Sequence, residues 1–111
     1  MITIKELVQL LVQINIPVVY SHFKVTENKP MPNPPFAVYL EEGSINFSAD
    51  NRVYKKLLNY RIEVYTNDKD LELEERIEGL FDDNKIYYET METFIDGEQL
   101  LLRTYYITLM K

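Results

Sequence analysis

The side chains that could do chemistry in this chain are one histidine, a few neighbouring carboxylates, and a basic stretch mixed with tyrosine. His22 is the only histidine, and Ser21 beside it would point the opposite way in an extended segment. A nucleophile and its base must instead lie within hydrogen-bond reach of each other. Because the chain has no cysteine, thiolate catalysis and cysteine-based metal sites are excluded. We interpret His22 as a structural or surface residue.

Neighbouring acidic residues occur at Glu41-Glu42, at residues 68–70 and at Asp82-Asp83. A site for a hard cation needs several converging carboxylates, and residues 68–70 begin like a calcium-binding loop. Leucines then interrupt the polar spacing and no glycine follows, so we interpret these acids as helix caps and solvated surface. The three glycines are isolated, and no phosphate-binding or nucleophile-elbow motif is present. We therefore predict no metal and no cofactor, and we identify no catalytic motif.

The basic stretch has two interpretations. Cations beside aromatic rings suit single-stranded nucleic acid, which binds by charge and stacking. Lysines on an edge strand also prevent sheets from joining edge to edge. The formal net charge of −6 favours the second interpretation, because phosphate binding needs clustered cations. We predict no specific nucleic-acid binding by this stretch, which comprises Arg52, Tyr54, Lys55, Lys56, Tyr60 and Arg61.

The composition indicates a single globular domain over residues 1–111. Hydrophobic residues make up 46% of the chain, which argues against intrinsic disorder. The nine tyrosines reflect either strand propensity or contacts with other chains, where tyrosine is enriched. No apolar run approaches the roughly 20 residues that span a bilayer, and no basic region precedes an apolar stretch at the N-terminus. We predict no signal peptide and no membrane contact.

The first third of the chain predicts a helix, a short strand and a stiff loop. Thr3 and Glu6 fit a capping box, and an apolar helical stripe follows until Pro17 limits it. Val18–Tyr20 is a candidate short strand. Four prolines between residues 30 and 35 exclude a helix interior or a central strand. This loop is a contact surface or a connector, and the connector is favoured.

Strand patterns dominate the remainder of the chain. We predict strands over residues 36–42, 45–49 and 53–65, with a turn at Gly43-Ser44 and a bulge near Leu57-Leu58.

A helix follows over residues 70–83, capped by Asp68 or Asp70. The last two strands, 85–95 and 98–110, flank Asp96-Gly97, which is a type I′ hairpin signal.

These elements predict an α+β fold: a mixed, mostly antiparallel, twisted sheet with two helices on one face, in the order α-β-β-β-α-β-β. The last strand is apolar on both faces, whereas a sheet covered by helices on one side usually has a polar second face. This two-sided pattern indicates cover from a neighbouring subunit.

Several segments together suggest a family. The proline-rich loop runs into PPFAVYLEE at residues 34–42, and the strand YRIEVYTND at 60–68 is followed by the acidic helix ELEERIEGLF at 72–81. Tyr88, Glu89 and the strand RTYYITL at 103–109 form the closing hairpin. With the N-terminal helix in its expected place, the chain resembles the small tail terminator proteins of long-tailed bacteriophages and prophages, also called tail completion or head–tail joining proteins.

The resemblance implies a structural protein rather than an enzyme. Members of this family form a hexameric ring on the end of the tail tube, stop its growth and provide the surface that docks to the filled head. The implied partners are further copies of the chain, the tail tube and head–tail connector proteins. The implied location is the virion, with assembly in the bacterial host cytoplasm.

The resemblance transfers few residues. It implies partner contacts by the proline-rich loop, by residues 46–54 and by the closing strand, namely Lys29, Met31, Asn33, Asn46, Phe47, Arg52, Tyr54, Tyr105 and Tyr106. The acidic net charge further suggests that a ring lumen is lined by carboxylates that let DNA pass without binding. We expect these lumen acids to be Glu41, Glu42, Asp82 and Asp83.

Three alternatives remain open at this point. A small adaptor or inhibitor would hold a host protein through a sheet edge or a tyrosine-rich patch. A neighbouring head–tail connector protein would share the size and element order. A metal-dependent nuclease would need convergent acids that bind a divalent cation, and the sequence supports it least.

Overall fold

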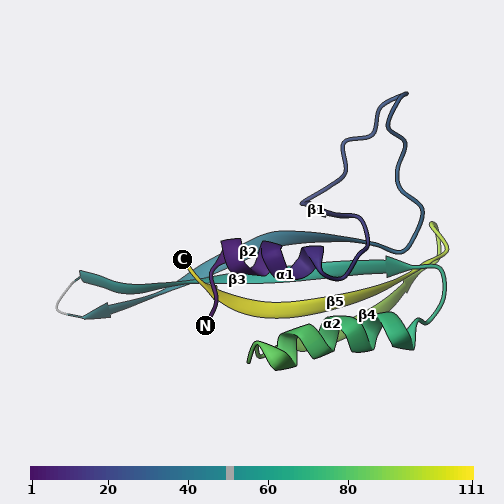
Figure 1. Cartoon of the computed structure of the whole chain (residues 1–111). Coiled ribbons are helices and arrows are strands. Elements are labelled where there is room, and N and C mark those ends of the chain that lie inside the picture. Colours follow the sequence, from purple (N-terminus) through teal and green to yellow (C-terminus); the bar gives the residue numbers. More distant parts are fainter. Residues whose placement is uncertain (50–51) are drawn as a thin grey trace.

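The computed structural model describes residues 1–49 and 52–111, and Figure 1 shows their arrangement. They form a five-stranded sheet in the order β1-β2-β3-β5-β4. Every neighbouring pair is antiparallel except β1 and β2, which run parallel. The predicted α+β class and the order α-β-β-β-α-β-β are both present. The elements are α1 (Ile4–Val12), β1 (Val18–Tyr20), β2 (Phe36–Ala49), β3 (Arg52–Thr66), α2 (Leu71–Asp83), β4 (Glu89–Ile95) and β5 (Leu100–Met110).

The strands are divided differently from the prediction, although the order agrees. Residues 36–42 and 45–49 belong to one strand, β2, so the predicted turn at Gly43-Ser44 is wrong. The ladder instead shifts register between Glu41 and Gly43, where an extra residue is absorbed as a bulge. The bulge predicted near Leu57-Leu58 is also wrong, because β3 pairs with β5 in unbroken register there.

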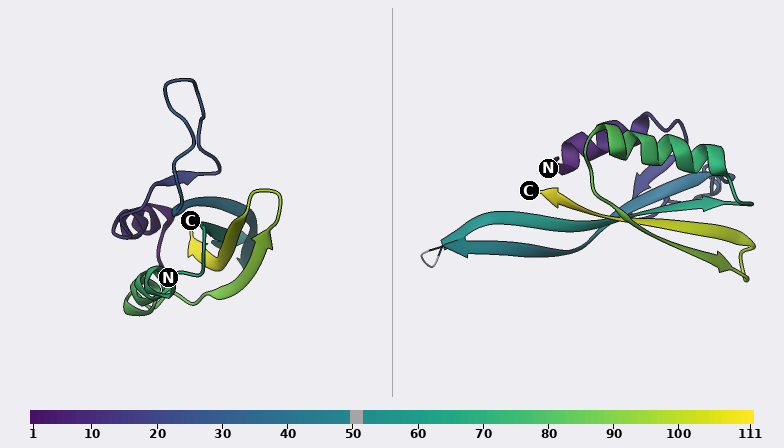
Figure 2. Two further views of the ribbon diagram at one scale, coloured as in Figure 1. Left: turned by 90° about the vertical axis from the view of Figure 1, so that its right-hand side faces the viewer. Right: turned by 90° about the horizontal axis from the view of Figure 1, so that it is seen from below.

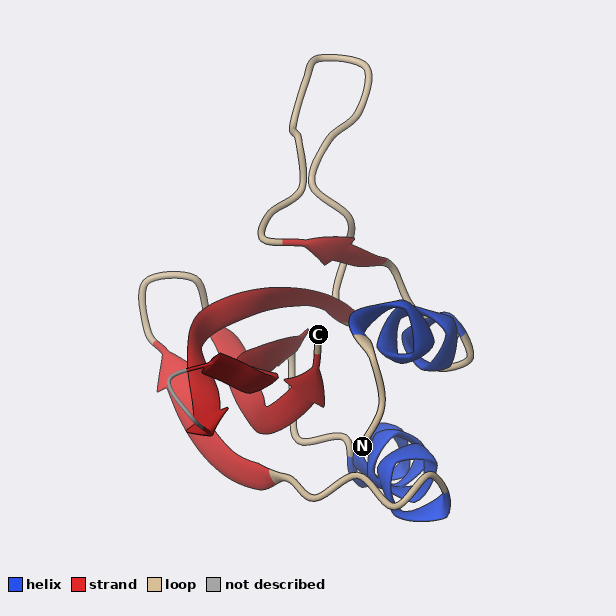
Figure 3. Cartoon of the chain, turned by 90° about the vertical axis from the view of Figure 1, so that its left-hand side faces the viewer, coloured by secondary structure: helices blue, strands red, loops and turns tan. Residues whose placement is uncertain are grey.

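Both helices cover the same face of the sheet (Figure 2). Thr3 caps α1 in the predicted capping box, where its hydroxyl accepts the Glu6 backbone N–H at 3.3 Å. Asp70 caps α2 by accepting the Leu73 N–H at 3.0 Å. The buried side of each helix packs on alternate residues of β3 and β5, and the resulting core includes Leu7, Leu11, Ile62, Leu73, Ile77, Phe81, Tyr105, Ile107 and Leu109. The strands curl into an arc when the sheet is seen end-on (Figure 3).

The closing hairpin is present, but its turn is longer than predicted. Ile95 pairs with Leu100, so residues 96–99 form a four-residue loop. The left-handed backbone position is Gln99, with φ of 54°, whereas Gly97 has no positive φ. The two-residue type I′ turn predicted at Asp96-Gly97 is therefore wrong.

A two-stranded ribbon projects from the body of the sheet (Figure 1). In β3 the ladder to β5 begins at Leu57, and β1 pairs only with residues 37–39 of β2. In the described part of the chain, Asn46–Ala49 and Arg52–Lys56 therefore have strand partners only in each other. We call these two segments the ribbon. It contributes to the elongated shape of the molecule, whose principal extents are 51 × 31 × 26 Å.

Candidate interaction surface

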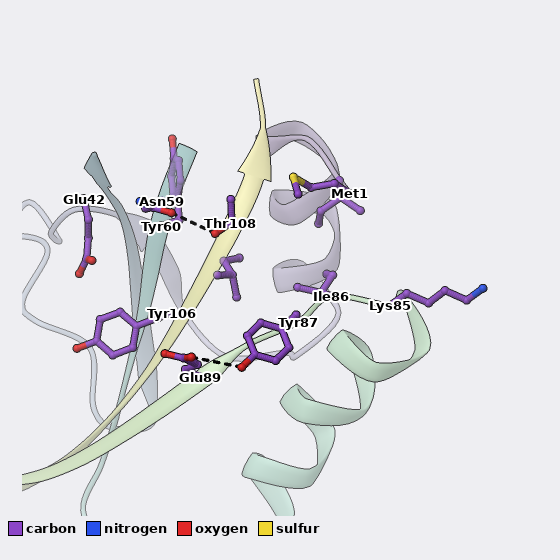
Figure 4. Close-up of a pocket in the computed structure, with 12 residues that line it drawn as sticks. Met1, Glu42, Asn59, Tyr60, Lys85, Ile86, Tyr87, Glu89, Tyr106 and Thr108 are labelled. Carbon is purple, nitrogen blue, oxygen red and sulfur yellow. Dashed lines mark hydrogen bonds between the residues drawn. The ribbon is translucent and has the colours of Figure 1, made fainter. Parts of the chain in front are cut away.

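A cleft of about 620 Å³ opens beside β5, near residues 59 and 60 of β3 (Figure 4). Strand β4 begins with Glu89 opposite Tyr106, and the Met110 N–H donates to the Ile2 carbonyl oxygen at 2.9 Å. Residues 107–109 of β5 lie between these two contacts and pair with β3 on one side. On their other side they have no strand partner among residues 1–49 and 52–111. The cleft occupies this gap in the edge of the sheet.

The backbone of Thr108 faces the cleft. The Met110 N–H points away from β3, since it donates to Ile2. Alternate residues of an antiparallel strand direct their N–H and C=O groups to the same side, and the ladder between β3 and β5 is regular here. Thr108 therefore presents its backbone donor and acceptor to the cleft, where an extended segment of a partner can pair with them.

The rim of the cleft combines exposed tyrosine with carboxylates. Tyr87 is 79% exposed, and its hydroxyl donates to Glu89 Oε1 at 3.3 Å. Glu42 lies on the opposite side of the cleft, beyond the ring of Tyr106 (Figure 4). Lys85 also lines the cleft and its side chain extends outward. Such a rim suits a partner that brings aromatic and cationic side chains.

Glu42 is held in place by Arg61. The Arg61 Nη1 donates to Glu42 Oε1 at 3.0 Å, and its Nε donates to Glu63 Oε2 at 2.9 Å. These carboxylates raise the pKa of the Arg61 guanidinium further above its already high value, chiefly through the hydrogen bond that Arg61 donates to Glu42. The ion pair with Arg61 thus fixes the position of the Glu42 carboxylate. It leaves the second carboxylate oxygen of Glu42 without a contact to Arg61.

A second polar cluster lies between α2 and the sheet. Arg103 contacts Glu74 at 3.5 Å and Glu78 at 3.2 Å on α2, and the Tyr105 hydroxyl donates to Glu78 Oε2 at 2.8 Å. Burial, followed by the hydrogen bond to Glu78, raises the pKa of Tyr105 above its usual range. These groups form ion pairs and hydrogen bonds with one another. The cluster therefore holds α2 against the sheet and is not a ligand site.

The residues predicted as partner contacts separate into three groups. Tyr105 is fully buried beneath α2, so its predicted contact with a partner is replaced by a role in the core. Tyr106 points to the other face of β5 and lines the cleft. Lys29, Met31 and Asn33 are exposed on the proline-rich loop, and the side chains of Asn46, Phe47, Arg52 and Tyr54 lie outside the described residues.

The four predicted lumen acids are all exposed. Glu42 lines the cleft, and Asp82 and Asp83 end α2 just before Lys85, which is also in the cleft. Glu41 is the neighbour of Glu42 on β2, and its N–H donates to the Tyr20 hydroxyl at 3.4 Å. Whether they line a lumen remains a prediction.

Of the twelve residues that line the cleft, the sequence predicted only Glu42 and Tyr106 as site residues, and Tyr87, Glu89 and Thr108 are among those that it missed. The segment 85–88 was predicted as strand, and the structure places β4 only from Glu89 onward. Tyr87 is exposed and Tyr88 is half-buried because both lie in this irregular segment. The sequence of the segment shows no helix or strand periodicity that would predict the difference. A gap in a sheet edge depends on strand lengths and has no local signature in the sequence.

The described residues hold no group of three or more acidic or histidine side chains placed to bind a metal ion. In the same residues, no helix is long and apolar enough to cross a membrane. His22 lies on the surface with its Nδ1 3.2 Å from the Ser21 hydroxyl.

In comparison with known proteins, the chain matches no protein-family model and no curated protein sequence.

Proposed function

We propose that this protein is a structural subunit of a phage virion that assembles into a closed ring, caps the tail tube and joins the tail to the head. The observation that carries the proposal is the ribbon. A two-stranded ribbon is marginally stable in water when nothing covers it. Asn46–Ala49 and Arg52–Lys56 extend beyond the rest of the sheet and have strand partners only in each other, which supports a role in contact with another molecule.

Further support comes from the segments that resemble tail terminator proteins. PPFAVYLEE enters β2, and YRIEVYTND lies on β3 and the residues before α2. ELEERIEGLF lies within α2, and RTYYITL lies within β5. The element order predicted from the residues, into which the resemblance fits, is the order of the fold. The ribbon and the cleft are different surfaces, as a ring requires when each copy meets two neighbours through unlike patches.

One observation favours an adaptor as the second candidate. Strand β4 ends the sheet and exposes Met91 and Phe94, so its outer edge could accept a strand from a host protein. An adaptor of this kind would remain a monomer or dimer and would have no effect on tail tubes.

The test of the proposed function is growth arrest of tail tubes. The tail-tube protein of the same phage or prophage is allowed to polymerise with and without this protein, and tube lengths are measured by electron microscopy. We expect shorter tubes of narrower length distribution, with added density at one end. Tubes that grow to the same length at every concentration of this protein would refute the proposal and favour the adaptor.

A further inference from the structure

The segment between α2 and β4 belongs to no strand, yet its side chains alternate between the two faces of the sheet. Ile86 is buried in the core, and the Tyr88 ring lies edge-on to the ring of Tyr105 on the face that the helices cover. Tyr87 is 79% exposed, and its hydroxyl donates to Glu89 on the other face (Figure 4). Alternation of this kind is the side-chain arrangement of a strand. The segment therefore continues the pattern of β4, although its backbone is not part of the sheet.

The register between β4 and β5 places this segment opposite the gap in the sheet edge. Glu89 lies opposite Tyr106, and the ladder is regular along the whole of β4. Continued by two residues, the same register puts Tyr87 opposite Thr108. Hydrogen-bonded and non-hydrogen-bonded pairs alternate in an antiparallel ladder, so Tyr87 and Thr108 would form a hydrogen-bonded pair, as Glu89 and Tyr106 do. The backbone donor and acceptor of Thr108 already point to this side, since they have the orientation of the Met110 N–H.

We propose that residues 87 and 88 form a strap that closes the cleft by pairing with the edge of β5. In the closed state, the Tyr87 N–H donates to the Thr108 carbonyl oxygen, and the Thr108 N–H donates to the Tyr87 carbonyl oxygen. The side chains keep the faces that they already have, so Tyr88 stays in the core while the backbone moves. The structure shows the open state, in which the cleft has a volume of about 620 Å³.

Both ends of the strap are fixed, which limits closure to this one step. On the side of α2, the Ile86 N–H donates to a carbonyl oxygen in the last turn of the helix at 2.8 Å. On the side of β4, Glu89 is already in the ladder. The place opposite Lys85 is occupied, because the Met110 N–H donates to Ile2. Closure thus adds a single hydrogen-bonded pair, whose net stabilisation is small enough for both states to be populated.

A closed strap uses the same two backbone groups that an extended partner segment would need. Addition of a partner strand to β5 therefore competes with the strap. The apparent affinity of the cleft for such a segment falls in proportion to the fraction of molecules that are open. The strap is thus a control on access to the cleft that is built into the chain. It goes beyond the proposed ring and acts whether or not the protein caps tail tubes.

A disulfide trap tests the closed state, and it is specific because the chain has no cysteine of its own. The strap variant is Tyr87→Cys with Thr108→Cys. Residues of a hydrogen-bonded pair have Cα atoms about 5.5 Å apart, a separation that a disulfide can bridge. The positive control is Thr93→Cys with Leu102→Cys, which are already opposite each other on the same face. The mismatched control is Tyr87→Cys with Leu102→Cys, which the register keeps six residues apart.

The rates of oxidation by oxidised glutathione, followed by mass spectrometry, give the first result. We expect the strap pair to oxidise at least about tenfold faster than the mismatched pair, because only closure brings its sulfurs within bonding distance. Oxidation should also slow hydrogen exchange of the amide at position 108 by about tenfold or more, since the trapped strap supplies its acceptor. Oxidation no faster than in the mismatched pair, or an unprotected amide in the oxidised protein, would overturn the strap.

Wild type provides a second test if circular dichroism shows that the strap variant does not fold. We expect NMR relaxation dispersion to show microsecond-to-millisecond exchange at the Thr108 amide. Tyr87→Pro should abolish this exchange, because proline has no N–H to donate to Thr108. Exchange that persists unchanged in Tyr87→Pro overturns the strap, as does its absence from wild type.

Discussion

Arg103 lies at the centre of the polar cluster that fastens α2 to the sheet. Its guanidinium contacts Glu74, Glu78 and, at 3.7 Å, Glu92, and its side chain is only 19% exposed. Removing one partner of a desolvated ion pair leaves the other charge uncompensated, which is costly. Exposed pairs contribute far less because water screens them.

We expect Arg103→Ala to lower the free energy of unfolding by about 2 kcal/mol, below the cost of a fully buried pair because this cluster is partly exposed. The matched control is Arg61→Ala at the more exposed pair with Glu42, which we expect to cost about 0.5 kcal/mol. Urea unfolding of both variants provides the comparison. Equal losses would show that the cluster does not fasten α2.

Tyrosine ionisation should govern stability at alkaline pH. Burial, followed by the hydrogen bond to Glu63, raises the pKa of Tyr65 to about 12, and burial raises the pKa of Tyr105 further. Unfolded tyrosine ionises near pH 10. Because the folded state keeps these hydroxyls neutral, their stabilisation is fully present below about pH 10 and is lost as pH rises through the folded pKa values.

The free energy of unfolding should therefore fall less steeply between about pH 10 and 12 in Tyr65→Phe than in wild type. The measurement is urea unfolding of wild type and variant at half-unit steps from pH 8 to 12. Tyr87→Phe is the control, because Tyr87 is largely exposed. Identical slopes for wild type and Tyr65→Phe would contradict the assignment.

At the scale of elements, α2 carries a glycine that packing does not require. A Cβ added at Gly79 would meet no atom within 4 Å outside the helix's own turn, and the residue has no positive φ. Glycine in a helix interior is less favourable than alanine by about 1 kcal/mol. We expect Gly79→Ala to raise the melting temperature by about 4 °C, measured by circular dichroism. A lower melting temperature would show a close contact at this position.

The ribbon should be separable from the folding of the body. Leu57 lies opposite Met110, whose N–H points away from β3, so Ile45 and Leu57 form a hydrogen-bonded pair between β2 and β3. Residues 46–56 can therefore be replaced by Asn-Gly, a type I′ turn that keeps the register. We expect the stability of this shortened protein to change by less than about 0.5 kcal/mol, because the core formed by the described residues lies outside the replaced segment. Self-association and tube arrest should both be lost. Retention of either would contradict the role of the ribbon.

The elements that the sequence predicted correctly have local signals. Thr3 and Asp70 cap their helices through side chains three residues away, and alternation along residues 60–65 marks a half-buried strand. The errors arose where a local signal had two meanings. Gly43-Ser44 is typical of a turn, yet it follows a bulge in a strand that continues because residues 44–49 pair with β3.

The candidate surface was less predictable because it depends on strand lengths and on what lies opposite each face. Tyr105 and Tyr106 are adjacent tyrosines with opposite environments, and the sequence alone does not show which one faces the helices. Glu42 was predicted from its charge. The cleft arises because β5 extends past the start of β4, and that offset appears only once the strands are paired.

At the scale of the whole molecule, the uneven charge predicts an effect of salt. The sequence has three basic residues at positions 52–56 in an otherwise acidic chain, and attraction between such opposite charges of two copies is screened as the Debye length falls from about 10 Å at 0.1 M to about 3 Å at 1 M. We expect self-association, measured by light scattering, to weaken as NaCl rises from 0.1 to 1 M. Association that strengthens with salt would indicate an apolar contact instead, such as one through Met91 and Phe94.

We propose that copies of this chain close into a ring at the end of a tail tube. Electron cryomicroscopy of tail tubes incubated with the protein provides the decisive measurement. We predict a ring of several copies at one end of each tube. Bare tube ends, or single copies bound along the sides of the tube, would contradict the claim.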